Sequence, residues 1–154
     1  MDRVRASLWV EIVGVVAIIV SLGLVAVEIR QNTDAISAQA VLALNDGINE
    51  TNLLVTSDVG FAELLMRADA AGERGLTSTE IARLERWTMA RANVYESAYE
   101  FHRKGILDSN RYASCHEATC AMATHPGEGA VLSKWKPFYD PDFVGYLEST
   151  CKRQ

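Results

Sequence analysis

Residues 8–29 read LWVEIVGVVAIIVSLGLVAVEI, and no charged side chain occurs between Ile12 and Val27. A bilayer hydrocarbon core of about 30 Å requires roughly 20 mostly apolar helical residues, which this stretch supplies. Glu11 and Glu28 are 17 positions apart, about 25 Å along a helix axis. Each carboxylate can therefore lie near a headgroup boundary, where a charge costs far less than at the midplane. The stretch predicts one transmembrane helix.

Two other structures compete with this prediction. A buried helix of a soluble protein normally has a polar face, whereas residues 8–29 are apolar nearly all round. A cleaved signal peptide would use Arg3 and Arg5 as its charged region and residues 24–26 as its cleavage site. The apolar run is longer than the usual core of a signal peptide, so we expect an uncleaved anchor.

The charges on the two flanks predict the orientation of this helix. Arg3 and Arg5 precede the apolar run, whereas Arg30 follows it and the next basic residue is Arg67. Because basic flanks stay on the cytoplasmic side, we expect a cytoplasmic N-terminus and the remainder of the chain on the opposite side. The lipid bilayer is thus one expected partner. The formal net charge of −5 argues against nucleic acid as another.

The rest of the chain is predicted to be helical throughout. Its three prolines all follow Thr124. We expect the membrane helix to continue as a helical stalk over residues 30–56, because apolar side chains recur there at helical spacing. Residues 57–154 then form a small helical bundle, and residues 1–7 are a flank. The fold class is therefore all-α: an N-terminal transmembrane helix (8–29), a stalk and a bundle.

Local signals divide the bundle into its helices. Ser57 or Asp58 can cap one helix, Asp108 can cap another, and Thr77 with Glu80 has the spacing of a capping box. A short helix is expected over residues 131–135, and Asp140-Pro141 opens the last one. Aromatic side chains in these segments are expected to pack in the bundle: Trp87, Trp135, Phe138, Tyr139, Phe143 and Tyr146.

Several short motifs resemble one group of proteins. They are Glu11-Ile-Val-Gly14, Val27-Glu-Ile-Arg-Gln-Asn-Thr33, Gly105-Ile-Leu-Asp108, and Trp135 followed by Asp140-Pro-Asp-Phe143. In these motifs the chain resembles small bacterial membrane-anchored proteins of unknown function, whose hydrophobic N-terminal helix ends in an I-x-Q-N-T motif. The resemblance implies a bacterial membrane-anchored helical protein. Together with the orientation expected from the flanking charges, it predicts a single-pass protein of the bacterial inner membrane with the bundle in the periplasm. It implies no activity.

One face of the first helix carries small and polar residues. Ser7, Gly14, Ser21 and Glu28 are seven positions apart, a spacing typical of a helix–helix interface. In lipid, association depends on close approach at small residues and on polar contacts. The predicted interface, called the stripe below, comprises Ser7, Glu11, Gly14, Ala17, Ser21, Glu28 and Asn32. Its partner is a second copy or a larger membrane complex. Alternatively, small residues are simply common in membrane helices, and Glu11 and Glu28 only reach the headgroups.

The three cysteines are candidates for one disulfide. Cys115 and Cys120, on one regular helix, would have Cα atoms about 8 Å apart, too far for a bond. A bond from either of them to Cys151 is sterically easier and would favour an oxidising compartment. Cys115, His116, Cys120 and His125 could also bind zinc, but their spacing is unlike the usual zinc motifs. We expect no metal and no cofactor.

Two functional hypotheses follow from these patterns. The first is a non-enzymatic interaction or assembly protein, either an oligomer or an accessory subunit. The second is a membrane-tethered small enzyme or a ligand- or metal-binding domain that uses Glu96 and Glu100 or the Cys/His cluster. No phosphate loop, nucleophile elbow or HExxH motif occurs. We expect Arg91, Tyr95, Glu96, Tyr99 and Glu100 to form a polar network in the bundle. The sequence therefore favours the first hypothesis and assigns no catalytic residue.

Overall fold

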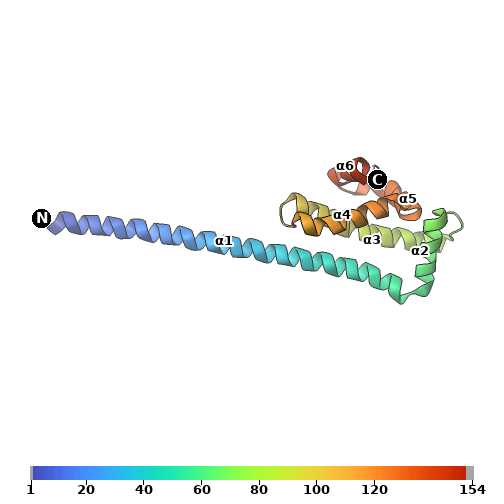
Figure 1. Ribbon diagram of the computed structural model, residues 1–154, viewed down its shortest axis with the longest axis horizontal. Helices are drawn as coiled ribbons and strands as arrows, with labels where there is room; N and C mark the ends of the chain where they lie inside the picture. The colour runs from blue at the N-terminus through green and yellow to red at the C-terminus, as the bar shows by residue number, and fades with distance from the viewer. Residues whose placement is uncertain (1, 152–154) are drawn as a thin grey trace. The chain divides into compact units, whose positions relative to one another are not determined.

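The computed structural model describes residues 2–151, with side chains described for Trp9, Glu11 and all residues from Val13 onward. These residues form helices and no strand, which confirms the all-α fold (Figure 1). The helices are α1 (Asp2–Ser57), α2 (Val59–Ala71), α3 (Ser78–Arg103), α4 (Ser109–Thr124), α5 (Pro126–Trp135) and α6 (Pro141–Thr150), with a 3-10 helix η1 (Lys136–Phe138) between the last two.

The chain divides into two compact units, Met1–Ala38 and Gln39–Gln154. The first is the N-terminal part of α1 alone. The second contains the end of α1 and all the later helices. The stalk expected over residues 30–56 is therefore divided, because its second half packs into the bundle. Ala40 and Leu44 are buried there, and Leu44 contacts a cluster that includes Ala98 and Leu107.

Four of the helices begin at the caps that the sequence predicts. The Asp58 carboxylate accepts a hydrogen bond from the backbone N–H of Phe61 at the start of α2. Thr77 and Glu80 form the reciprocal capping box at the start of α3. Asp108 caps α4 and Asp140 caps α6 in the same way. Each cap satisfies backbone N–H groups that have no partner within the helix.

Helix α5 is longer than predicted, because it begins at Pro126 rather than near residue 131. Proline suits the first helical position. From the sequence, Gly127 and Gly129 are as compatible with a turn as with a helix. In the structure they permit close packing of α5 against its neighbours. A Cβ atom at Gly127 would lie 2.8 Å from the Cβ atom of Ala68, and one at Gly129 would lie 2.6 Å from the carbonyl oxygen of Ala123.

The core of the bundle surrounds α3, which contacts α2, α4 and α5. One buried cluster joins α2, α3 and α5 and contains Phe61, Leu64, Ala68, Leu84, Trp87 and Val131. Another joins α3 to α6 and contains Phe143, Tyr139 and both half-cystines. The packing prediction for Phe138 is wrong: its side chain is 75% exposed in η1 and contacts the Trp135 ring.

Candidate functional site

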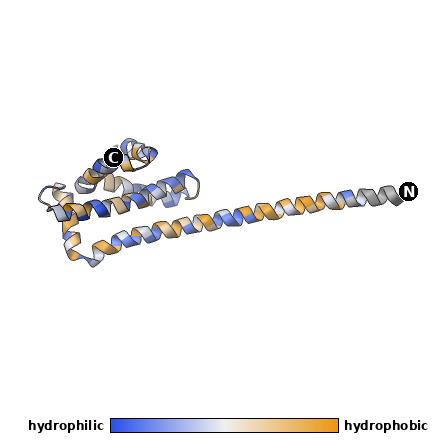
Figure 2. Cartoon of the chain, turned by 180° about the vertical axis from the view of Figure 1, so that it is seen from behind, coloured by the Kyte–Doolittle hydropathy of each residue, from blue (hydrophilic) through white to orange (hydrophobic). Residues whose placement is uncertain are grey.

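The N-terminal part of α1 has an uncovered apolar surface. Within residues 13–57, α1 is long and apolar enough to cross a membrane, and none of its most apolar window is buried. From Val13 to Ile29, every valine, isoleucine and leucine is between 49% and 64% exposed. Figure 2 shows this apolar segment in orange. Since a continuous apolar surface of this kind marks a membrane or protein contact, it is the first candidate site.

The predicted stripe lies on this segment, with its side chains exposed. Glu11, Gly14, Ala17, Ser21, Glu28 and Asn32 are all exposed, whereas the side chain of Ser7 lies outside the described residues. A Cβ atom at Gly14 would meet nothing within 4 Å. The Ser21 hydroxyl donates to the Ala17 carbonyl at 2.8 Å, so it can still accept a hydrogen bond from a neighbour. That a partner helix covers the stripe stays a prediction.

A disulfide joins α4 to the residue after α6. Cys120 and Cys151 are bonded, with their Cα atoms 4.8 Å apart, and both are buried. Of the two pairings with Cys151 that the sequence leaves open, the structure has this one. Cys115 is a free, half-buried thiol. Burial raises the pKa of that thiol, which disfavours the reactive thiolate.

The possible zinc ligands make contacts of other kinds, although His116 Nδ1 also lies 4.0 Å from Cys120 Sγ. The Nδ1 atom of His125 lies 2.8 Å from an Asp69 carboxylate oxygen, and His116 Nδ1 contacts the Tyr146 hydroxyl. Cys120 is held in the disulfide. No group of three or more His, Cys, Asp or Glu side chains in the described part of the chain is arranged to hold a metal ion.

The carboxylates of α3 make structural contacts. A Glu96 oxygen accepts the Asp140 backbone N–H at 2.6 Å, next to the cap of α6. Glu100 forms an ion pair at 2.5 Å with Lys104, the C-cap residue of α3. The expected polar network is thus divided among several partners. Arg91 donates to the Tyr95 hydroxyl at 3.2 Å, and its main partner lies on another helix.

That main partner is Glu128 in the first turn of α5, which sequence reasoning did not identify. Arg91 Nη1 and Glu128 Oε1 are 2.5 Å apart, and the two side chains are only 18% and 8% exposed. Burial raises the pKa of Glu128, although the Arg91 charge opposes that rise. The guanidinium also lies 4.6 Å from the centre of the Trp87 ring. The pair links α3 to α5, since either charge alone would be buried without a partner.

A second candidate site is a groove between the end of α1 and α3. The two helices approach closely at Gly47, where a Cβ atom would lie 2.8 Å from a Val94 methyl carbon. From there the groove extends to Ser57 and has a volume of about 800 Å³. We call it the α1/α3 groove. Its lining residues are Gly47, Glu50, Thr51, Leu53, Leu54, Ser57, Phe61, Thr79, Ala82, Arg83, Arg86, Trp87, Ala90 and Val94.

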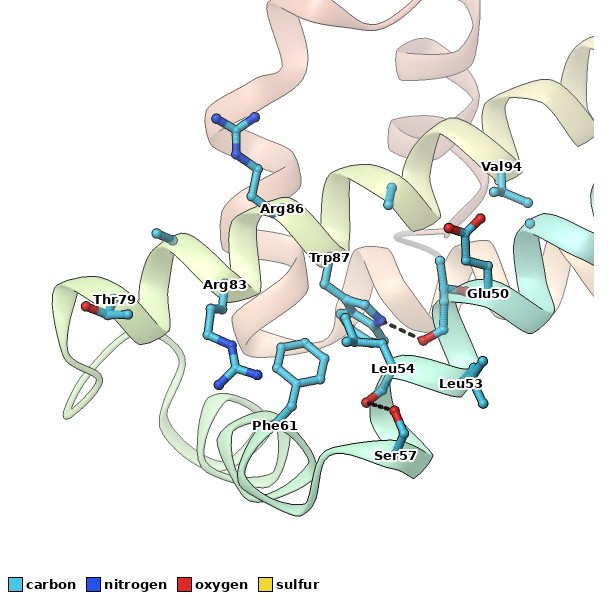
Figure 3. A pocket seen from close by; sticks show the side chains of 14 residues that line it. Glu50, Leu53, Leu54, Ser57, Phe61, Thr79, Arg83, Arg86, Trp87 and Val94 are labelled. Atoms are coloured by element: carbon cyan, nitrogen blue, oxygen red, sulfur yellow. Dashed lines mark hydrogen bonds between the residues drawn. The ribbon is translucent and has the colours of Figure 1, made fainter.

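Two aromatic rings form the inner wall of the α1/α3 groove (Figure 3). Phe61 and Trp87 meet edge to face, with ring centres 5.6 Å apart. The indole N–H of Trp87 donates to the Thr51 carbonyl at 3.1 Å and so ties α3 to α1. On the outer side Leu53 is 65% exposed and Leu54 is 43% exposed. The groove is therefore an open apolar surface of the bundle.

The charged side chains of the groove differ in their partners. Arg83 is ion-paired with Asp58 at 2.5 Å and lies beside the Phe61 ring. Glu50 lies on the α1 wall and Arg86 on the α3 wall, and the Arg86 side chain points away from the Phe61 and Trp87 rings in Figure 3. Within the described residues neither Glu50 nor Arg86 forms an ion pair. The sequence alone did not reveal the groove, because its walls are more than 20 residues apart along the chain.

Comparisons with the models of known protein families, with curated proteins and with solved structures found no match to this chain.

Proposed function

We propose that the chain is a non-enzymatic interaction protein, anchored by one helix in the bacterial inner membrane. Through the stripe on α1 it assembles with itself or docks onto a larger membrane complex as an accessory subunit. The observation that carries the proposal is that no residue of the apolar segment from Val13 to Ile29 is buried. That surface needs lipid around it, and the small residues on one face suit a helix neighbour.

The alternative of a tethered enzyme has less support. Its candidate carboxylates, Glu96 and Glu100, are engaged with the Asp140 backbone and with Lys104. The free thiol of Cys115 is half-buried, and its raised pKa keeps it protonated. Only the Glu96 contact joins two helices, and none of these contacts brings the candidate groups together as a catalytic set.

Two observations support a periplasmic bundle and a cytoplasmic N-terminus. Disulfides persist in oxidising compartments such as the periplasm, and the Cys120–Cys151 bond lies in the bundle. Arg3 and Arg5 precede the apolar segment, as expected for a cytoplasmic flank. The assignment to a bacterial membrane rests on the sequence resemblance described above.

Small-to-large substitutions on α1 test the proposal. Gly14→Leu and Ser21→Leu place bulk on the stripe. The matched controls Gly23→Leu and Ala26→Leu place the same bulk on the other side of the helix, since about 100° separates successive residues. We expect the stripe variants to reduce the assembly size of the full chain in mild detergent, or to lose proteins that co-purify from native membranes. The controls should do neither. If stripe and control variants behave alike, the stripe is not an interface.

A further inference from the structure

We propose that the α1/α3 groove is a contact between two copies of this chain, in which Glu50 of each copy faces Arg86 of the other. The inference rests on the proposed function for one point only, namely that the membrane helices bring copies together. It adds a second interface, in the bundle, which uses residues outside the stripe and a pair of complementary charges.

The apolar character of the groove supports a protein occupant of helical shape. Two helices that are close at Gly47 and Val94 and then separate leave room for the side chains of a third helix between them. The α3 wall offers Thr79, Ala82 and Ala90, whose small exposed side chains permit the close approach of a helix. The α1 wall offers Leu53, whose side chain is largely exposed and can enter the groove of a neighbour.

The charges identify the occupant as a second copy. Glu50 and Arg86 have opposite signs, stand on opposite walls and have no ion-pair partner within the described residues. In a two-fold symmetric pair the same surface meets itself, so the acidic wall of one copy faces the basic wall of the other. The dimer then contains two Glu50–Arg86 ion pairs, one in each groove. Arg83, which has Asp58, needs no such partner.

Membrane anchoring makes a weak contact of this kind sufficient. Two chains held together by their transmembrane helices present their bundles to each other at a high effective concentration, on the order of millimolar for short links. At that concentration, two grooves with little affinity for each other would still be in contact for much of the time. Exposed ion pairs of the Glu50–Arg86 kind add modest affinity but strong selection against wrong pairings.

Exchange of the two charges tests the proposal. Glu50→Arg makes both walls basic, and Arg86→Glu makes both walls acidic. Each variant alone should weaken dimerisation of the full chain in detergent, measured by sedimentation equilibrium, by about tenfold, which corresponds to roughly 1.4 kcal/mol. An equimolar mixture of the two variants should restore wild-type affinity, because each basic groove then meets an acidic one. The double variant E50R/R86E should restore it as well.

Three results would overturn the inference. If the double variant recovers wild-type affinity but the mixture of single variants does not, Glu50 and Arg86 pair within one chain rather than between copies. If all the charge variants associate like the wild type, the groove is not an interface. Leu53→Glu, compared with Met66→Glu on exposed α2 surface outside the groove, provides a further check. If only Leu53→Glu has an effect and the charges have none, the groove holds a lipid or detergent chain.

The same measurements separate this inference from the proposed function. Gly14→Leu and Ser21→Leu report on the stripe, whereas E50R and R86E report on the groove. If the stripe variants dissociate and the groove variants do not, the proposed function stands and the groove contact fails. If the groove variants dissociate and the stripe variants do not, the groove contact stands and the stripe is not an interface. Unchanged thermal unfolding by circular dichroism shows that each variant is folded.

Discussion

The two parts of α1 have the same secondary structure but different surroundings. Before Ala38, the apolar side chains of Val13–Ile29 are exposed on every side of the helix. After it, Ala40 and Leu44 are buried against the bundle, while polar side chains occupy much of the remaining surface. The difference lies in the distribution of apolar residues rather than in helix propensity. An all-round apolar surface suits lipid, and a one-sided surface suits a protein core.

The two parts of α1 therefore depend on two different free energies, that of bundle folding and that of transfer into lipid. Burial of core side chains and the disulfide stabilise the bundle. Under the proposed function, transfer of apolar surface into lipid would hold the first part of α1 in a membrane. A substitution in one region should leave the other unchanged. The following predictions test that separation, from the largest expected effect to the smallest.

Phe143→Ala should produce the largest loss of bundle stability. The Phe143 side chain, on α6, is fully buried and packs against the aromatic rings of Tyr99 and Tyr139. Removing a buried phenylalanine ring costs about 3–5 kcal/mol, which urea unfolding followed by circular dichroism would measure. The fraction of chain in the membrane should not change. If it falls while the bundle stays folded, the two regions are coupled.

Removing the disulfide should have a similar effect on the bundle. The bond closes a loop with a sequence separation of 31 residues. In the chain-entropy account, opening such a loop costs about 3–4 kcal/mol. The double variant C120S/C151S, measured by the same unfolding experiment, should show that loss. Cys115→Ser, at the half-buried free thiol, is the control and should cost less than about 1 kcal/mol.

Ile19→Arg should act on the membrane segment alone. Ile19 is 63% exposed near the middle of the apolar run. An arginine at the centre of a membrane helix costs about 2.5–3.5 kcal/mol of insertion free energy. We expect a larger fraction of uninserted chain by alkaline carbonate extraction, with unfolding of the bundle unaltered. Full insertion of the variant would show that residues 8–29 do not cross the membrane midplane.

Acid should weaken the bundle through Glu80, with the smallest effect of the four. The Arg67 guanidinium, together with hydrogen bonds from Thr77, lowers the pKa of Glu80 from 4.5 to about 2. A carboxylate whose pKa is lower in the folded state than in the unfolded chain stabilises the folded state at pH values above its unfolded pKa. That stabilisation is lost as the pH falls from about 4.5 towards 2. Glu80→Gln should reduce the pH dependence of thermal unfolding in this window. An unchanged slope would show that the cap of α3 does not depend on the charge.

Local features were predictable from the sequence, and long-range ones were not. The helix caps at Asp58, Thr77, Asp108 and Asp140 depend on residues within one turn, so their spacing alone predicts them. The long apolar run is equally local.

The ion pair of Arg91 with Glu128 joins residues 37 positions apart, and the α1/α3 groove forms where two such distant helices separate. Neither leaves a periodic pattern in the sequence. The acidic Glu128 in the first turn of a helix was a weak signal, since carboxylates are favoured at helix N-termini.

The central claim is that one face of α1 contacts protein and the opposite face contacts lipid. Spin labels at Ser21→Cys and Ile19→Cys test it directly in bilayers, in a Cys115→Ser background. The two positions lie at nearly the same depth but about 160° apart around the helix. We predict that membrane-dissolved oxygen reaches the label at residue 19 much more readily than the label at residue 21. Equal accessibility at the two positions would contradict the claim.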